Sequence, residues 1–405
     1  MSYFPGSPRV ARRISIVTGH DLDSQCLSLS EKSYCFLYVS NSYRRQSGTA
    51  HNSLDHCAQG GQFRTPTDTP LASMKHYKIP NTDLAVSRIA YGCANLLGWD
   101  AKSYAADALA KASRSIHCAY DSGITLFDQA DTYGFGRSER ALGEILRQSP
   151  GLRNKVVLQT KSGMDFSTPD GPYQLQFNCS YQHLINSVEG SLSRLGTDRL
   201  DVLLLHWSDA LVEPEEVAKA FDELKRSGKV RYFGVSNHTP GQIDLLKKFL
   251  DQPIVINQVR LSLGICGLIL EGFSNTWFMN TDLTDHCHWP GVTGTLDYCR
   301  THDIQIQAYS PLRGGLLNPP TEASPQIREL SQGLADIAQK ENTKPATLAL
   351  AWLLRHPANI VPVVSSTNIE RLRENCAADH LTVSRDDWYT LLRLAALIKR
   401  DNPAT

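Results

Sequence analysis

The sequence lacks a charge excess of either sign. Among its 405 residues, lysine plus arginine number 41 and aspartate plus glutamate also number 41. A surface that binds nucleic acid or an anionic membrane usually carries an excess of basic residues, so we expect neither partner. Long apolar runs are missing too. The longest, such as "VLLLHW" and "IVPVV", fall far short of the roughly 20 residues that cross a bilayer.

Cysteine pairs with C-x-x-C spacing are absent as well. The ten cysteines are scattered along the chain, which is typical of reduced packing cysteines in an intracellular protein and not of a disulfide framework. We therefore expect a cytoplasmic protein. One dense group of possible metal ligands, "DHCHW" at 285–289, has neighbouring side chains that point in different directions, so no metal site is expected.

Residues 1–73 lack any sustained hydrophobic period. They are rich in serine, glycine and arginine, which predicts a poorly ordered N-terminal extension. The basic residues Arg9, Arg12 and Arg13 precede the first acid, Asp21, so one interpretation is a mitochondrial transit peptide. We favour the other interpretation, a dispensable segment before Met74, and expect its deletion to leave folding and activity intact.

From residue 75 onward the chain alternates short apolar segments with amphipathic ones. Helical spacing is clear in 182–195 and 213–227. The apolar segments are typical of buried parallel strands, and they span 88–94, 124–128, 155–161, 200–206, 230–236, 254–259, 304–310 and 360–365. Eight strands alternating with helices predict a (β/α)8 TIM barrel, here over residues 74–400.

An open doubly wound sheet is the competing fold. It requires a complete glycine fingerprint, G-x-G-x-x-G, after its first strand. The stretch "TLFDQADTYGFGRSE" offers Gly134 and Gly136, but Glu139 stands where the third glycine belongs. The incomplete fingerprint favours the barrel.

Polar residues recur where the apolar segments stop, which is where a barrel collects its catalytic groups. Taken alone, Asp128 is typical of a helix cap, Tyr133 of a loop aromatic and Lys161 of a solvated strand end. His206 beside Trp207 is typical of a core histidine. Their joint occurrence favours a shared site, whose candidates in chain order are Asp128, Tyr133, Lys161, His206, Ser236, Asn237, Gln258 and Ser310.

At these positions the sequence resembles the aldo-keto reductases. The matching stretches run in the family's order from about residue 78 to 395. They are "GITLFDQADTYG…SERALGEIL", "VVLQTKSG", "RLDVLLLHW", "GKVRYFGVSN", "INQV", "AYSPL" and "SSTNIERLREN". The resemblance implies a catalytic tetrad of Asp128, Tyr133, Lys161 and His206. It also implies NAD(P)H-dependent reduction of an aldehyde or ketone, an oxidoreductase activity with no catalytic metal.

The chemistry requires these residue types independently. Hydride transfer to a carbonyl builds negative charge on oxygen, which needs a proton donor. A phenol with a pKa of about 10 is a poor donor at neutral pH, and a neighbouring ammonium lowers that pKa. Lys161 can therefore tune Tyr133, while Asp128 holds the lysine. His206 can orient the carbonyl oxygen and share in proton delivery.

The same resemblance implies a cofactor site. Ser236 and Asn237 would bind the nicotinamide carboxamide, supported by Gln258, and Tyr309 would stack on the ring. Arg371 suits a 2′-phosphate and favours NADPH over NADH. Backbone groups around Ser310, Leu312 and Gly314 would contact the pyrophosphate. The adenosine-phosphate region is implied at Ser365, Ser366, Arg371 and Asn375.

Two questions stay open from the sequence. Some relatives of this fold are cofactor-binding regulatory subunits of ion channels with little turnover, and a retained tetrad does not distinguish them. The segment 264–293 is long for a loop after a strand; its Trp277, Phe278 and Trp289 would cover an apolar substrate or pack as a surface flap. The identity of the small carbonyl substrate and the oligomeric state are not encoded in any motif.

Overall fold

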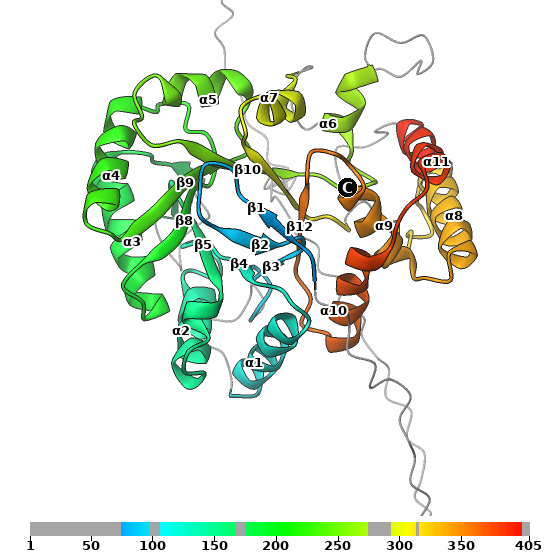
Figure 1. The fold of residues 1–405 in the computed structure, drawn as a ribbon, viewed down its shortest axis with the longest axis horizontal. Helices are drawn as coiled ribbons and strands as arrows, with labels where there is room; N and C mark the ends of the chain where they lie inside the picture. Colours follow the sequence, from blue (N-terminus) through cyan, green and yellow to red (C-terminus); the bar gives the residue numbers. More distant parts are fainter. Residues whose placement is uncertain (1–73, 98–105, 167–174, 274–292, 313–315, 399–405) are drawn as a thin grey trace, which may run out of the picture. The chain divides into compact units, whose positions relative to one another are not determined.

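Eight parallel strands form a closed barrel in the computed structural model (Figure 1). The structure describes residues 74–97, 106–166, 175–273, 293–312 and 316–398. Neighbours in the barrel follow chain order, and each predicted strand segment overlaps one barrel strand. The barrel strands are β3 (Ala90–Gly92), β4 (Leu126–Asp128), β5 (Val157–Ser162), β8 (Leu200–Leu205), β9 (Val230–Ser236), β10 (Ile254–Arg260), β11 (Gln305–Tyr309) and β12 (Val361–Val364). The predicted TIM barrel is confirmed, and the open-sheet alternative is wrong.

Helices surround the strands (Figure 1). The predicted helix at 182–195 illustrates why they form: the Ser180 side chain accepts from the amide of His183, and Gly196 ends the helix in the left-handed conformation. Its apolar face is buried against the barrel. The helices are α1 (Ala106–Asp121), α2 (Arg137–Gln148), α3 (Tyr181–Leu195), α4 (Pro214–Arg226), α5 (Pro240–Lys247), α6 (Gly267–Leu270), α7 (Thr295–Thr301), α8 (Pro325–Lys340), α9 (Pro345–Leu354), α10 (Ile369–Cys376) and α11 (Arg385–Ala396).

Two antiparallel hairpins were not predicted from the sequence. One pairs β1 (His76–Lys78) with β2 (Ala85–Ser87), and the other pairs β6 (Met164–Phe166) with β7 (Leu175–Phe177). Strands of three residues are too short to show an alternating pattern. The first hairpin lies at the amino end of the barrel, because Asp83 in its turn pairs with Arg231 near the start of β9. This leaves the carboxyl ends of the strands for the candidate site.

Some predictions lie outside the described residues. They concern the extension at 1–73, the ligand-like group at 285–289, Gly314, and the three aromatic residues of the 264–293 segment. Within the described ranges, no helix is long and apolar enough to cross a membrane. The six cysteines described there are free thiols, as predicted.

Candidate active site

Four side chains predicted from the sequence meet at the carboxyl end of the barrel. Asp128 is the last residue of β4, and Lys161 lies near the end of the neighbouring strand β5. The Lys161 Nζ lies 2.7 Å from both carboxylate oxygens of Asp128, 2.9 Å from the Gln129 carbonyl and 3.0 Å from the Tyr133 hydroxyl. The ammonium therefore bridges a carboxylate and a phenol inside the protein.

The burial of this ion pair shapes its electrostatics. The side chains of Lys161 and Asp128 are 1% and 3% exposed. Burial lowers the pKa of Lys161, and the negative charge of Asp128 opposes that change. The lysine thus depends on its carboxylate partner to keep its charge at a dry site.

A tight loop presents Tyr133 to the lysine. Gly134, Phe135 and Gly136 all have positive φ, at 56°, 57° and 79°. Glycine adopts this region freely, whereas Phe135 is strained there. The two glycines therefore turn the chain back toward α2, and they do not form a phosphate-binding fingerprint.

His206 follows β8 and faces the tyrosine. The two rings are nearly perpendicular, at 82°, with centroids 5.9 Å apart. Burial, reinforced by the Lys161 charge, holds the pKa of His206 well below its usual value, so the imidazole is neutral. Its Nδ1 atom is buried and has no hydrogen-bond partner among the residues that the structure describes. A buried N–H without an acceptor is less favourable than an unpaired lone pair, so we place the proton on Nε2.

The residues predicted to hold a nicotinamide lie beside this group. The Tyr309 hydroxyl donates to the Asn237 Oδ1 over 3.1 Å, and the Asn237 Nδ2 donates to the Ser236 hydroxyl over 2.9 Å and to the His206 carbonyl over 3.3 Å. Asn237 and Ser310 have positive φ values of 60° and 53° at the ends of their strands. Such strain at the ends of two strands, β9 and β11, which both pair with β10, is typical of a functional site.

Gln258 links the predicted cofactor residues to the buried ion pair. Its amide nitrogen donates into the barrel, to the Asp128 Oδ1 at 3.0 Å and to the Gln307 Oε1 at 2.9 Å. Both amide hydrogens are therefore used inside the protein, and the Gln258 oxygen is the atom that remains to meet a ligand.

A second group of predicted residues lies where β12 leads into α10. Arg371 is exposed and forms no ion pair within the described part of the chain, whereas Asn375 is buried. Ser365 is exposed, and the Ser366 hydroxyl is held by Asn368 in a local turn. Of these four predicted residues, Arg371 and Ser365 are the accessible ones.

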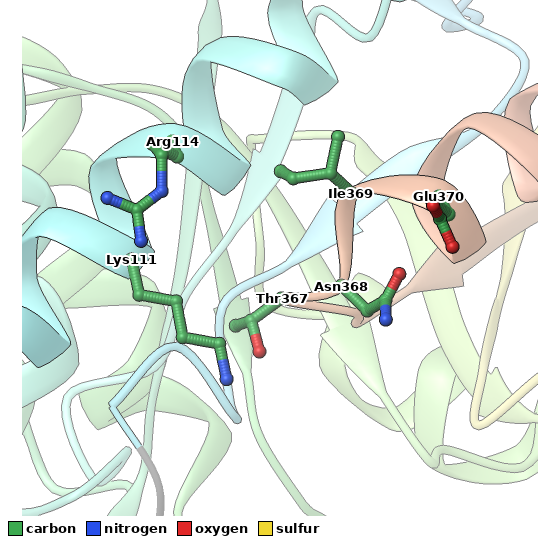
Figure 2. A pocket seen from close by; sticks show the side chains of 6 residues that line it. All are labelled: Lys111, Arg114, Thr367, Asn368, Ile369 and Glu370. Atoms are coloured by element: carbon green, nitrogen blue, oxygen red, sulfur yellow. The ribbon is translucent and has the colours of Figure 1, made fainter. Parts of the chain in front are cut away.

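A pocket of about 460 Å³ lies between α1 and the start of α10 (Figure 2). Lys111 and Arg114 extend from α1 along one side of it, and Figure 2 shows the start of α10 on the other side. Glu370 is the acidic residue among those that line it. The sequence did not point to Lys111 or Arg114, since isolated basic residues on a helix look like solvated surface positions. The residues of this side in the wall are Thr367 and Asn368, just before α10, and Ile369 and Glu370 in its first turn.

Comparison with known proteins agrees with this geometry. Residues 88–395 match the model of the aldo/keto reductase family. The chain is 36% identical to a 6-dehydroglucose reductase of Agrobacterium fabrum over 77% of this chain and 95% of that protein. It is 34% identical to the oxidoreductase YdhF of Escherichia coli over 68% of this chain and 84% of that protein.

A solved structure shares the fold. The glycerol dehydrogenase from Gluconobacter oxydans matches with a TM-score of 0.67 and 24% identity, over 82% of this chain and 97% of that one. Members of the matched family are oxidoreductases that use nicotinamide cofactors. By its barrel and by the match over most of its length, this chain belongs to the aldo/keto reductase family.

Proposed function

We propose that this protein reduces an aldehyde or ketone to the alcohol with NADPH, and that Tyr133 donates the proton. The observation that carries the proposal is the 3.0 Å contact between the Lys161 ammonium and the Tyr133 hydroxyl. A buried cation on a phenol stabilises the phenolate that proton transfer leaves behind. The reaction is reversible, so the same residues would serve alcohol oxidation.

The roles of the four residues follow from their contacts. Asp128 holds Lys161 with both carboxylate oxygens. The neutral His206, with its proton on Nε2, can donate a hydrogen bond to the carbonyl oxygen and orient it toward Tyr133. NADPH supplies the hydride when it is bound, so the protein itself needs only to bind, orient and deliver a proton.

The residues present fit a nicotinamide cofactor. Ser236 and Asn237 offer polar groups at one strand end, and the Gln258 oxygen can accept from a carboxamide N–H. Tyr309 adds an aromatic face next to them. The accessible cations Lys111 and Arg114 line the pocket beside α10, and the exposed Arg371 follows the lining residue Glu370 in the chain. Cations there suit a phosphate and favour NADPH over NADH.

Apolar side chains flank the candidate site. The rings of Phe177 and Trp207 lie 6.5 Å apart. Trp207 directly follows His206. We propose a small carbonyl compound as the substrate, with its apolar part against this side.

The test removes only the phenolic hydroxyl. We expect Tyr133→Phe to bind NADPH like the wild type, measured by cofactor fluorescence, and to lose nearly all reduction of an aldehyde and ketone panel. Tyr389→Phe on α11 is the matched control and should keep its activity. Turnover by Tyr133→Phe at the wild-type rate would overturn the proposal. Tight NADPH binding with no turnover of any carbonyl by the wild type would favour a cofactor-binding regulatory protein instead.

The cofactor preference has its own test. We expect Lys111→Ala and Arg371→Ala each to raise the KM for NADPH about tenfold, since one charge-assisted contact contributes about 1.4 kcal/mol. The KM for NADH should change less than twofold. Equal effects on both cofactors would contradict a 2′-phosphate contact.

A further inference from the structure

Three buried glutamines form a polar layer inside the barrel. Gln159 belongs to β5, Gln258 to β10 and Gln307 to β11, and none is more than 1% exposed. Much of the remaining barrel interior is an apolar cluster, which includes residues such as Val202 and Val255. Three amides in this position require an explanation. Aliphatic side chains would fill the same space, whereas each buried amide loses its hydrogen bonds to water.

The amides connect to the catalytic carboxylate. The Gln159 Nε2 lies 2.6 Å from the Asp128 Oδ1 and 2.8 Å from the Gln307 Oε1. The Gln258 Nε2 makes the same pair of contacts, at 3.0 Å and 2.9 Å. The Gln307 Nε2 returns a hydrogen bond to the Gln159 Oε1 over 3.0 Å. Gln307 therefore bridges the two glutamines that contact Asp128.

Chemistry fixes the orientation of all three amides. An ionised carboxylate can only accept, so Gln159 and Gln258 must turn their nitrogens toward Asp128. Their second hydrogens then require an acceptor, which the Gln307 oxygen supplies to both. With two amides and Lys161, the Asp128 Oδ1 has three donors.

We propose that Gln159 and Gln307 are positioning residues that keep the Asp128 carboxylate aimed at Lys161. This inference rests on the proposed carbonyl reduction, in which Lys161 acts on Tyr133. Gln159 acts directly on the carboxylate, and Gln307 acts by holding both amides in place. Neither residue contacts the reacting atoms; both act through the ion pair.

The ionisable groups around the lysine define what a pH profile would report. Besides Asp128, the groups facing Lys161 are the Cys93 thiol after β3, the Asp131 carboxyl in the loop after β4, His206 after β8 and Tyr133 itself. Burial and Asp128 keep the pKa of the Cys93 thiol well above its usual value, and the pKa of His206 is well below its own. A basic limb in the profile is therefore assigned to Tyr133 by comparing its midpoint with a direct titration of the Tyr133 hydroxyl.

The principal variant is Gln159→Leu, which removes the closest donor to Asp128. Loss of a residue that orients a catalytic group typically lowers activity 10- to 100-fold. We expect a fall of that size in the single-turnover rate of NADPH oxidation, with the Kd for NADPH changed less than threefold. The double variant Gln159→Leu/Gln307→Leu removes both partners of a buried hydrogen bond and leaves fewer orphaned groups, so it serves if the single variant does not fold.

The matched control is Gln305→Leu. Gln305 lies on the same strand as Gln307 and is 4% exposed, but its amide oxygen has no hydrogen-bond partner within the described ranges of the chain. We expect the control to keep the wild-type rate and pH profile. A loss of rate in Gln305→Leu equal to that in Gln159→Leu would show that any buried change in the barrel suffices, and would overturn the proposal.

A readout without cofactor or substrate completes the test. Ultraviolet titration of tyrosinate, with Tyr133→Phe as the subtracted reference, follows the Tyr133 hydroxyl in the free protein. We expect its midpoint to rise by on the order of one pH unit in Gln159→Leu, because a misplaced Lys161 stabilises the phenolate less. An unchanged midpoint in Gln159→Leu and in the double variant would overturn the positioning role. If the wild type reduced no carbonyl, the proposed function would fail while this titration still tested the network.

Discussion

Removing one partner of the buried Lys161–Asp128 pair should destabilise the protein more than removing both. In Lys161→Met, the Asp128 carboxyl is left in the barrel without its cation. Breaking a buried pair in this way costs about 3–5 kcal/mol, whereas an uncharged replacement of both partners is close to neutral. Asp128 would keep the Gln159 and Gln258 donors at 2.6 Å and 3.0 Å, so the lower half of that range is expected.

Thermal unfolding is a suitable assay. A domain of this size shifts in Tm by roughly 2 °C per kcal/mol, so Lys161→Met should lower the Tm by about 6 °C. The double variant Asp128→Asn/Lys161→Met should unfold within about 2 °C of the wild type, since no buried charge remains. Both variants should lose activity. A difference in Tm between them therefore reports the uncompensated buried charge and not the catalytic role of the pair.

An exposed pair supplies the control. Lys340 and Asp387 lie 2.9 Å apart, but the lysine is 62% exposed. Lys340→Met should therefore change the stability by less than about 1 kcal/mol. The reasoning fails if the double variant is as unstable as Lys161→Met, because the loss would then come from packing and not from an uncompensated charge.

Two further predictions concern the surroundings of the site. Burial raises the pKa of Asp131 to about 7, so its folded form holds a proton that the unfolded chain has released. This contribution to stability is complete below about pH 4 and is lost as the pH rises through 7; it amounts to at most about 4 kcal/mol. Asp131→Asn should therefore raise the Tm at pH 8 and not at pH 4, and an equal change at both would refute this. Gly143→Ala should lower the Tm by several degrees, because the new Cβ would lie 2.4 Å from the Arg194 carbonyl oxygen. An unchanged Tm would show that α2 and α3 can move apart there without a loss of stability.

The barrel could be predicted because its strands are buried on both faces. Segments such as 200–206 are mostly apolar, with Val202–Leu205 as an unbroken apolar run, and the helices between them carry capping signals such as Ser180 and Gly196. The short hairpins gave no signal, since β1 and β6 have only three residues each. Periodicity detects elements long enough to repeat, and shorter ones depend on tertiary contacts.

The candidate site was predictable to the extent that its residues end strands. Asp128, Lys161 and His206 stand where apolar runs stop, and the structure brings them together. Gln159 and Gln307 lie inside such runs, where a polar residue in an apolar segment has no obvious partner in sequence. They contact each other across 148 positions of the chain, and only the closure of the barrel makes that contact visible.

The two ends of the barrel differ in the interactions that they contain. At the amino end, Asp201 pairs with Arg153 and Arg231 at 3.0 Å each, and an apolar hairpin covers the interior. At the carboxyl end, the backbone of Asn237 and Ser310 is strained, and the Lys161 side chain is a buried charge. Each of these features at the carboxyl end is unfavourable by itself. Their concentration at one end is what a site needs if its polar groups must be fixed before the substrate arrives, and the well-packed opposite end supplies the stability that permits it.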